Sequence, residues 1–495
     1  MLNKIDELLN SITMYRLVLY YLTLLLIVAF IYSIFGVLPF TGVRLGISTT
    51  ILLIVSLLTN KLLEKIFKVQ TNYESLYITA LILVFIITPA KNLNDIFFLV
   101  IIATISMATK FILNIKGKHI FNPAAIAVLI TAITIQRYAS WWVGTLAMFP
   151  FTLLGILIVR KIRKLDLVFY FFISGIVSTF LFYILRGNTN IIQIIKNIFF
   201  DSPILFFAFV MLTEPLTTPP TALLQSIYGG IVGILFSPMH VGLLFTTPEI
   251  ALSIGNIFSY IVSPKEKLTL KLTHKIKLTP NTYDFVFSSN QKLKFISGQY
   301  LEWTLSQNHV DSRGNRRYFT IASSPTENEI RIGIKFPEDK SSSFKREMLD
   351  MEIGNQIIAS SLAGDFKLPN DKTQKLVFIA GGIGITPFRS IVKYLIDTNE
   401  KRDIVLIYSD KTKDMMVYKD IFDEAVTKLN LKVIYYESEK RGHITPVFLQ
   451  QEIPDFKDRL FYLSGSNAMV IGFENVLSNL KLPKKQVKVD YFPGF

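Results

Sequence analysis

Two short stretches in the second half of the chain carry side chains suited to binding phosphates and transferring electrons. AGGIGITP, Ala380 to Pro387, is a glycine-rich turn between an apolar run and a helical pattern. Glycines let a backbone approach a pyrophosphate closely, and a helix N-terminus adds N–H groups and a favourable dipole. RYFT, Arg317 to Thr320, offers a cation for a diphosphate, an aromatic face and a hydroxyl on one strand. Each pattern alone is weak evidence, so the interpretation depends on their combination.

The residues around these stretches predict the elements that would position them. Residues 266–370 alternate polar and apolar side chains, and this period of two predicts β-strands. Residues 375–492 alternate apolar strands with helical patterns, which predicts a parallel sheet with crossover helices. The predicted boundaries are 264–370 for an antiparallel β-barrel domain and 371–495 for an α/β nucleotide-binding domain.

The first half of the chain differs in composition from the second. Residues 1–263 are dominated by Ile, Leu, Phe and Val in long runs, close to the roughly 20 residues that a helix needs to cross a bilayer. The runs predict an all-α polytopic membrane domain with ten spans. The predicted spans are about 14–37, 43–60, 73–89, 95–113, 120–136, 140–159, 166–185, 198–213, 221–237 and 246–263.

The charge distribution predicts an orientation for these spans. The formal net charge is +15, which in a membrane protein indicates cytoplasmic loops rich in Lys and Arg rather than binding to nucleic acid. With both chain ends inside, the inner loops hold more Lys and Arg than the outer ones. We therefore expect a multi-pass cell-membrane protein whose C-terminal half is cytoplasmic. A cleavable signal peptide is not expected, because no small-residue cleavage site follows the first span.

The cysteine and histidine content limits the redox chemistry. The chain has no cysteine, which excludes disulfides, Cys-ligated zinc and Cys-ligated iron–sulfur clusters. His119 and His240 are the only histidines among or beside the predicted spans. Two haems would need facing pairs of axial histidines, so a bis-haem membrane oxidase is excluded. No metal site is expected.

In their order and spacing, GQYLEW, Arg317 to Thr320 and AGGIGITP resemble the ferredoxin–NADP reductase family, from about residue 266 to the chain end. The resemblance implies FAD and NADH or NADPH as cofactors. The implied FAD-binding residues are Arg317, Tyr318, Phe319, Thr320, Gly333, Ile334, Lys335, Ser342, Ser343 and Phe492. The implied nucleotide-binding residues are Gly381, Gly382, Gly384, Thr386, Pro387, Ser409, Asp410 and Gly465. The implied catalytic residues are Thr320, Ser464 and Phe495.

Two features of the C-terminal motifs bear on catalysis. Ser464 stands where the family often has a cysteine, which implies slower or retuned hydride transfer without loss of the nucleotide site. The terminal DYFPGF puts Tyr491, Phe492 and Phe495 where the family often stacks an aromatic ring on the flavin.

The segment after the strand DIVLIY bears on the choice of nucleotide. Asp410 can bond a ribose 2′-hydroxyl and so favours NADH, the nucleotide that we expect. Lys411 and Lys413 follow closely enough to meet a 2′-phosphate, which keeps NADPH as an alternative.

Polar residues at two predicted span ends mark a candidate site in the first half. Asn122 and Pro123 open the span that follows KHIF, and Glu214 follows Thr213 at the end of an apolar run. A charge there is costly in a bilayer and is a functional candidate. With RKIRKLDLVF (160–169) and GNIFSY (255–260), these motifs resemble the B subunit of the sodium-pumping NADH:quinone reductase and the D subunit of the related Rnf complex, over about 40–263.

This second resemblance implies flavin carriers in the bundle, but an attachment point is missing. Those subunits attach FMN to a threonine nine residues before the Thr that precedes the acid–Pro pair. Counting back from Thr213, that position is Ile204, which has no hydroxyl. Covalent FMN is therefore not expected, unless the register differs and Ser202 substitutes. Non-covalent FMN or riboflavin in the bundle stays open.

These observations predict a membrane flavoprotein that passes electrons from cytoplasmic NAD(P)H through FAD into or across the membrane. A quinone or an extracytoplasmic flavoprotein is the expected acceptor. Two alternatives stay open. The helical half is a transporter of a flavin or an ion that the reductase drives or regulates, or it only anchors a reductase of a soluble acceptor.

Overall fold

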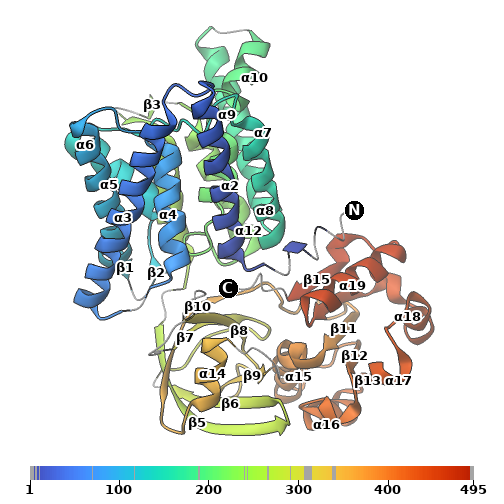
Figure 1. Ribbon diagram of the computed structural model, residues 1–495. Helices are drawn as coiled ribbons and strands as arrows, with labels where there is room; N and C mark the ends of the chain where they lie inside the picture. Colours follow the sequence, from blue (N-terminus) through green and yellow to red (C-terminus); the bar gives the residue numbers. More distant parts are fainter. Residues whose placement is uncertain are drawn as a thin grey trace. The chain divides into compact units, whose positions relative to one another are not determined.

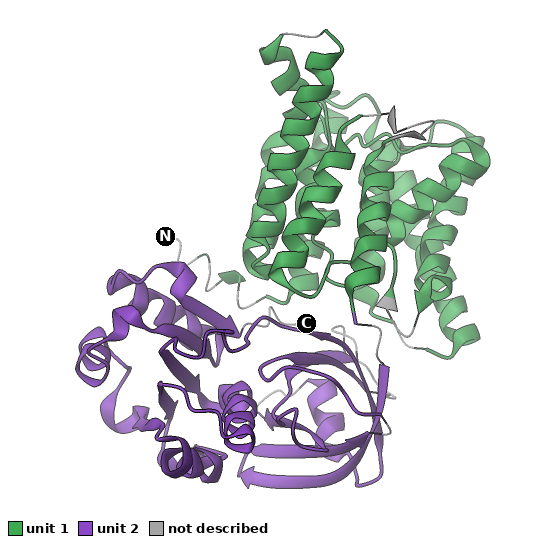
Figure 2. Ribbon diagram, turned by 180° about the vertical axis from the view of Figure 1, so that it is seen from behind, with its two compact units in different colours: residues 1–263, 312–314, 493–495 green, residues 264–311, 315–492 purple. Residues whose placement is uncertain are grey.

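The computed structural model divides the chain into two compact units, one ending at Ser263 and the other beginning at Pro264 (Figures 1 and 2). The first is helical, and the second contains an antiparallel and a parallel sheet, as predicted. Each unit has its own hydrophobic core. The structure describes residues 5, 8–9, 12–69, 71–115, 118–187, 190–238, 240–241, 244–264, 267–289, 291–305, 311, 315–336 and 342–490.

The helices of the first unit begin at polar caps between apolar runs. Asn72, Asn122 and Thr247 accept backbone N–H groups at the starts of three of them, which satisfies donors that a helix leaves open. The helices are α2 (Met14–Ile34), α3 (Gly42–Phe67), α4 (Tyr73–Ile86), α5 (Leu93–Ile112), α6 (Pro123–Ile135), α7 (Phe149–Thr152), α8 (Ile156–Ile162), α9 (Leu165–Leu185), α10 (Ile191–Phe199), α11 (Ile204–Phe206), α12 (Ala222–Phe236) and α13 (Pro248–Val262). The short strands are β1 (Asn114–Ile115), β2 (Lys118–His119), β3 (His240–Val241) and β4 (Leu244–Phe245).

The prediction of ten spans is wrong. Among the described residues, four helices are long and apolar enough to cross a membrane, namely α2, α3, α5 and α9. The expected spans at 73–89, 120–136, 221–237 and 246–263 form helices of only 13–15 residues. The expected span at 140–159 is broken into α7, a 3₁₀ turn and α8. At 198–213, α10 is followed by the helical segment Ile204–Met211 at a bend of 49°, and this pair could form a fifth span.

The breaks have a physical cause that hydropathy does not report. α4 ends at Ile86, shortly before Pro89, and leaves carbonyls open at its C-terminus. The non-helical segment at 140–143 donates hydrogen bonds to these carbonyls. Trp141 N donates to Ile86 O at 3.0 Å, and Trp142 Nε1 donates to Val84 O at 2.8 Å. Non-helical backbone is tolerated in a membrane protein where other protein satisfies it. Because the residues in these breaks are themselves apolar, the sequence reads as continuous spans.

The antiparallel sheet curves around one helix and forms a half-barrel (Figure 1). Trp303 and Phe287 pack with Phe344 of α14 (Ser343–Asp350) in its core. The register places Glu302 opposite Tyr318 and Tyr300 opposite Thr320. In sheet order the strands are β8 (Arg316–Thr320), β7 (Tyr300–Thr304), β10 (Gln356–Ala363), β5 (Lys267–Thr279), β6 (Thr282–Ser289) and β9 (Ile330–Lys335).

All neighbouring strands of the second sheet are parallel, as predicted. In sheet order they are β13 (Lys432–Glu437), β12 (Ile404–Asp410), β11 (Leu376–Gly381), β14 (Leu460–Ser464) and β15 (Val487–Asp490). The helices α15 (Thr386–Thr398) and α16 (Lys419–Leu429) pack on one face, and α18 (Pro446–Glu452) and α19 (Asn467–Asn479) on the other. The short helix α17 (Ser438–Arg441) follows β13. The strands' carboxyl ends meet at one edge, which is where ligands bind in such sheets.

Candidate active site

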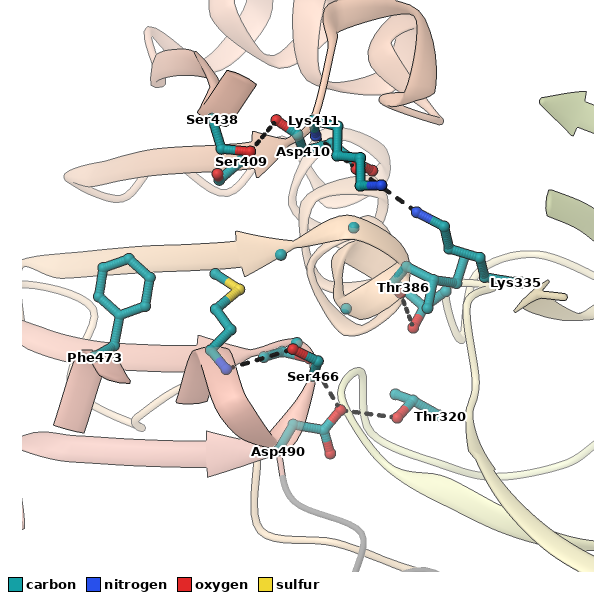
Figure 3. Close-up of a pocket in the computed structure, with 18 of the residues that line it drawn as sticks. Thr320, Lys335, Thr386, Ser409, Asp410, Lys411, Ser438, Ser466, Phe473 and Asp490 are labelled. Carbon is teal, nitrogen blue, oxygen red and sulfur yellow. Dashed lines mark hydrogen bonds and ion pairs between the residues drawn. The ribbon is translucent and has the colours of Figure 1, made fainter. Parts of the chain in front are cut away.

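A cavity of about 560 Å³ lies at the carboxyl edge of the parallel sheet, against β8 and β9 of the antiparallel sheet (Figure 3). Both sheets belong to the second unit, and both contribute side chains to the cavity wall. The structure brings most of the predicted cofactor residues to it. They are Tyr318, Phe319, Thr320, Gly333, Ile334, Lys335, Gly381, Gly382, Gly384, Thr386, Ser409, Asp410, Ser464 and Gly465.

The other predicted residues divide into three groups. Phe492 and Phe495 lie outside the described residues. Pro387 is buried in the first turn of α15, where its fixed backbone suits the helix start. Arg317, Ser342 and Ser343 gather around the N-terminus of α14 instead of the cavity.

The N-terminus of α14 holds a carboxylate where the family resemblance implies a diphosphate. Ser343 N donates to Asp311 Oδ2 at 3.1 Å, and Arg317 Nη2 lies 3.6 Å from Asp311 Oδ1. Ser342 Oγ caps the same helix by accepting Lys345 N. The Asp311 carboxylate thus lies between a helix dipole and a guanidinium, two features that favour an anion. The donor set present here fits the pyrophosphate of FAD.

Glycines in the turn between β11 and α15 are required by close packing. A Cβ at Gly384 would lie 2.5 Å from the Ser464 carbonyl oxygen, and Gly382 has φ +53°. No side chain fits the first position, and few residues adopt the second conformation. Gly333 was predicted as a flavin residue, but a Cβ there would lie 2.8 Å from the Tyr418 hydroxyl. Packing within the protein is therefore sufficient to explain the glycine at position 333, without a bound flavin.

The carboxylate that joins the two sheets was missed by the sequence analysis. Thr320 Oγ1 donates to Asp490 Oδ2 at 2.9 Å, and Ser464 Oγ donates to the same oxygen at 3.3 Å (Figure 3). Burial raises the pKa of Asp490 to about 6, against the lowering effect of both hydrogen bonds. Asp490 opens the DYFPGF motif, but no strand was predicted before it. The alternation in Val487–Asp490 was the available signal for β15.

An ion pair crosses the cavity at the end of β12. Lys335 Nζ lies 3.6 Å from Asp410 Oδ1, and the same oxygen accepts Lys411 N at 2.8 Å (Figure 3). Of the two lysines considered for a 2′-phosphate, Lys411 lines the cavity. The Lys413 ammonium instead lies 5.8 Å from the centre of the Tyr435 ring.

In the helical unit, the structure joins three of the predicted motifs in one polar cluster. Asn122 Nδ2 donates to Glu214 Oε2 at 2.8 Å, and Asn122 N donates to Asn256 Oδ1 at 2.9 Å. Asn256 belongs to the GNIFSY motif, and its Nδ2 donates to Tyr228 OH at 3.1 Å. Thr213 is directed away from this cluster, since its hydroxyl donates to Phe209 O. We call these residues the Asn122–Glu214–Asn256 cluster.

The C-terminal half thus combines a half-barrel and a parallel sheet, and side chains of both sheets line one cavity. The C-terminal half matches the ferredoxin–NADP reductase and flavohemoprotein-like NAD-binding family. The match to the family described as Oxidoreductase NAD-binding domain covers residues 378–474. It includes the glycine turn, β12, β14 and most of α19.

Two relatives illustrate the similarity. A flavohemoprotein of Oceanobacillus iheyensis is 26% identical over 239 residues, which is 45% of this chain and 58% of the relative. A glycine betaine monooxygenase reductase subunit of Chromohalobacter salexigens is 22% identical over 222 residues, which is 41% of this chain and 59% of the relative. The chain thus spans less than two thirds of the length of the curated relatives it matches.

Two solved structures are similar to about half of the chain. The ferredoxin-NADP+ reductase from Plasmodium falciparum is 23% identical with a TM-score of 0.40, and the similarity covers 46% of this chain and 97% of that one. The flavohemoglobin from Malassezia yamatoensis is 19% identical with a TM-score of 0.42, and the similarity covers 58% of this chain and 72% of that one. The family match and the curated relatives support FAD and NAD(P)H as cofactors of the C-terminal half.

Proposed function

We propose that the chain is a membrane-bound, flavin-dependent NAD(P)H oxidoreductase that delivers electrons to an acceptor in or across the membrane. The observation that carries this proposal is the meeting of Thr320 and Ser464 on Asp490 at the wall of the cavity. One hydroxyl comes from the half-barrel and the other from the parallel sheet. A flavin held by the half-barrel and a nicotinamide held by the parallel-sheet domain would therefore meet beside Asp490, which can hold a proton.

The residues around α14 and β8 would hold FAD. Arg317 and the N–H of Ser343 would bind its pyrophosphate in place of the Asp311 carboxylate. Phe319 and Thr320 lie on β8 and line the cavity, where the ring system would bind. When bound, the flavin accepts a hydride from the nicotinamide and can release the two electrons singly.

Asp490 would hold and release a proton during turnover. A group whose pKa lies near the working pH is suited to general acid–base chemistry, and burial brings the pKa of Asp490 to about 6. Thr320 and Ser464 would pass the proton toward the cavity, because both hydroxyls already contact Asp490 Oδ2. Serine at 464 fills the role of a hydrogen-bond donor there, where the resembling family often has a cysteine.

The carboxyl ends of β11 and β12 would bind the nucleotide. Gly382, Gly384 and Thr386 lie at the start of α15, where backbone N–H groups and the helix dipole favour a pyrophosphate. Asp410 would bond a ribose 2′-hydroxyl, which favours NADH over NADPH because a 2′-phosphate would meet its negative charge. Lys335 and Lys411 beside it reduce that discrimination without removing it.

We further propose that the helical unit lies in the cell membrane, with the reductase half in the cytoplasm. The four long apolar helices support this, as do the broken segments that are packed against other protein. The Asn122–Glu214–Asn256 cluster would border a site for a quinone or a non-covalent FMN or riboflavin, since buried polar groups in a membrane domain are costly unless they serve function or packing. A quinone or an extracytoplasmic redox protein would receive the electrons.

A covalent flavin does not belong to this proposal. Ile204 is 1% exposed and packs in the helical core. The hydroxyl of Ser202 accepts Ile204 N at 3.2 Å, so it acts as a local cap. Flavin measured in the pellet after acid precipitation of the full chain tests this point. Flavin that remains bound to the protein would contradict it.

Vesicles that carry the full chain and enclose an electron acceptor test the main proposal. NADH added outside should reduce the FAD, and then the enclosed acceptor. Reduced FAD with no internal reduction, in vesicles with and without a quinone, would show that electrons do not enter the membrane. A reductase of a soluble acceptor would then be the better description. NADPH in place of NADH gives the nucleotide preference in the same assay.

A further inference from the structure

A buried arginine links the nucleotide-binding helix to the turn that follows the flavin strand. Arg389 lies one helical turn beyond Thr386 on α15, and its residue is 4% exposed. Its Nη1 donates to Ala322 O at 2.8 Å, and both terminal nitrogens bind the Glu327 carboxylate, at 2.8 and 3.0 Å. The next residue repeats the link, because Ser390 Oγ donates to Ser323 O at 2.6 Å.

The segment held by Arg389 begins at the end of the flavin strand. Thr320 is the last residue of β8, and Ala322 follows two positions later. Glu327 closes this turn by accepting Ser324 N at 2.7 Å. Thr320 on one wall of the cavity and Thr386 on the other are thus connected by two short stretches of chain and one guanidinium. The path has no flexible side chain other than the arginine itself.

The far side of Arg389 is fixed as well. Its guanidinium carbon lies 5.4 Å from the centre of the Tyr418 ring, and Tyr418 OH donates to Asp284 Oδ1 at 3.0 Å. Asp284 is paired with Arg331 at 3.0 Å, so its charge is balanced on the half-barrel side. The guanidinium is therefore held between an aromatic face and a bidentate carboxylate, the geometry for which arginine is suited.

We propose that Arg389, with Glu327 as its counter-ion, is a positioning residue that sets the separation between the flavin-side hydroxyl of Thr320 and the nucleotide-binding turn. This inference rests on the proposed function. Magnitudes favour positioning over stability as its main role. Replacing a buried ion pair by uncharged residues of similar volume is often neutral for stability, whereas misplacing a reacting group by about 1 Å can cost about 100-fold in rate.

The test replaces both charges together in the full chain, so that neither partner is left buried and unpaired. In Arg389→Met with Glu327→Gln, kcat for NADH-dependent reduction of a soluble acceptor should fall about 10- to 100-fold, because the two walls lose their fixed separation. KM for NADH, FAD content and the thermal midpoint should stay near those of the wild type. Hydrogen exchange of residues 320–327 should become faster, a readout that needs no turnover.

A closely matched control pair lies in the same unit. Arg402 and Glu400 have side chains 5% and 15% exposed, against 5% and 18% for Arg389 and Glu327. The Arg402 guanidinium also binds two carbonyls, Pro369 O and Asp371 O, but it does not reach the turn after Thr320. Arg402→Met with Glu400→Gln should leave kcat and exchange at 320–327 unchanged.

The remaining outcomes separate a failure of the Arg389 inference from a failure of the proposed function. A wild-type rate and wild-type exchange in the Arg389 double variant would overturn the inference. If that variant does not fold, Ser390→Ala removes one link, and it should raise exchange at Ser323 and lower kcat by a smaller factor; no change in either would also overturn it. If the wild type itself binds no FAD, the proposed function fails, while the exchange data still report whether Arg389 fixes the turn.

Discussion

In each unit of the molecule, a carboxylate accepts at least one hydrogen bond from a donor that is distant in sequence. In the helical unit, Glu214 Oε2 accepts Asn122 Nδ2 at 2.8 Å and Thr217 Oγ1 at 3.4 Å. In the reductase unit, Asp490 Oδ2 accepts Thr320 and Ser464 hydroxyls at 2.9 and 3.3 Å. The hydrogen-bonding patterns are alike, but the surroundings are not.

The difference lies in what else the donors do. The Asn122 side chain also accepts the N–H groups of Ala124 and Ala125, so Glu214 is tied to the start of α6. Thr320 and Ser464 end their strands at the wall of a cavity that could contain a substrate. The comparison shows that the role of a carboxylate depends on whether its hydrogen-bond donors also hold a helix in place or line a cavity. Changes at Glu214 should lower the stability of the helical unit without slowing the reduction of FAD by NADH, and changes at Asp490 should slow that reduction.

The largest effect is expected where an added side chain would displace the glycine turn at the cavity wall. Gly384→Ala places a Cβ about where the Ser464 backbone lies, at 2.5 Å, so the turn must move. NADH-dependent reduction should fall by about 100-fold or more, since the turn positions the nucleotide. Stopped-flow reduction of FAD by NADH measures it. Gly472→Ala is the control, because no atom lies within 4 Å of a Cβ there. An unchanged rate in Gly384→Ala would mean that the cavity is not the nucleotide site.

The next effect tests Asp490 directly. Asp490→Asn keeps the shape but cannot take up a proton near neutral pH, so the rate should fall about 100-fold, as is typical of a lost acid–base group. The wild-type rate should change with pH around 6, the raised pKa of Asp490, and the variant should lose that dependence. Rates measured from pH 5 to 8 decide this. A variant with the wild-type profile would mean that Asp490 serves packing alone.

The same variant should be more stable than the wild type above pH 6. The folded carboxyl has a pKa of about 6 against 3.8 for the free group, so the folded state binds its proton more tightly. Wild-type stability therefore falls as the pH rises between these values. Asparagine does not titrate, so its advantage, about 1–3 kcal/mol, should disappear below about pH 4. Thermal unfolding of the apoprotein at several pH values measures it.

At Glu214 a smaller effect is expected, and it should lower stability instead of the reductase rate. Glu214→Leu leaves the Asn122 amide without its acceptor, which should cost about 1–3 kcal/mol in the stability of the helical unit. NADH-dependent reduction of a soluble acceptor should be unchanged. Thermal unfolding in detergent and the reductase assay separate the two. Asp166→Leu removes an exposed carboxylate in the first turn of α9 and serves as the control. Loss of reductase activity in Glu214→Leu would contradict the proposed division of roles.

The two units also differ in how much of them the sequence predicts. In the reductase unit, apolar strands are separated by turns and helical patterns, so KLVFIA and DIVLIY were correctly predicted as strands of one parallel sheet, in which they prove to be neighbours. In the helical unit, apolar runs do not reveal that α4 stops at Ile86 or that Trp141 continues as irregular backbone. Hydropathy measures side chains, while the break is decided by backbone hydrogen bonds to another segment.

The candidate site shows the same limit. Thr320 and Ser464 could be named from motifs, because each is the last residue of its own strand. Asp490 could not be paired with them from local pattern alone, since the contact exists only after β15 joins the edge of the sheet beside β14. Likewise, the motifs named Asn122 and Glu214 separately, and tertiary packing brings them together with Asn256.

A third carboxylate extends the comparison and gives the smallest expected effect. Asp311 occupies the anion position at the N-terminus of α14, and its side chain is 24% exposed. It should compete with the FAD pyrophosphate for Arg317 and Ser343 N, so Asp311→Asn should tighten FAD binding. A partly exposed ion pair is worth up to about 1 kcal/mol, so the gain should be about fivefold at most. Titration of apoprotein by flavin fluorescence measures it, with Asp350→Asn at the other end of α14 as the control. Weaker FAD binding in Asp311→Asn would mean that this carboxylate holds the fold together and does not occupy the position of the cofactor's pyrophosphate.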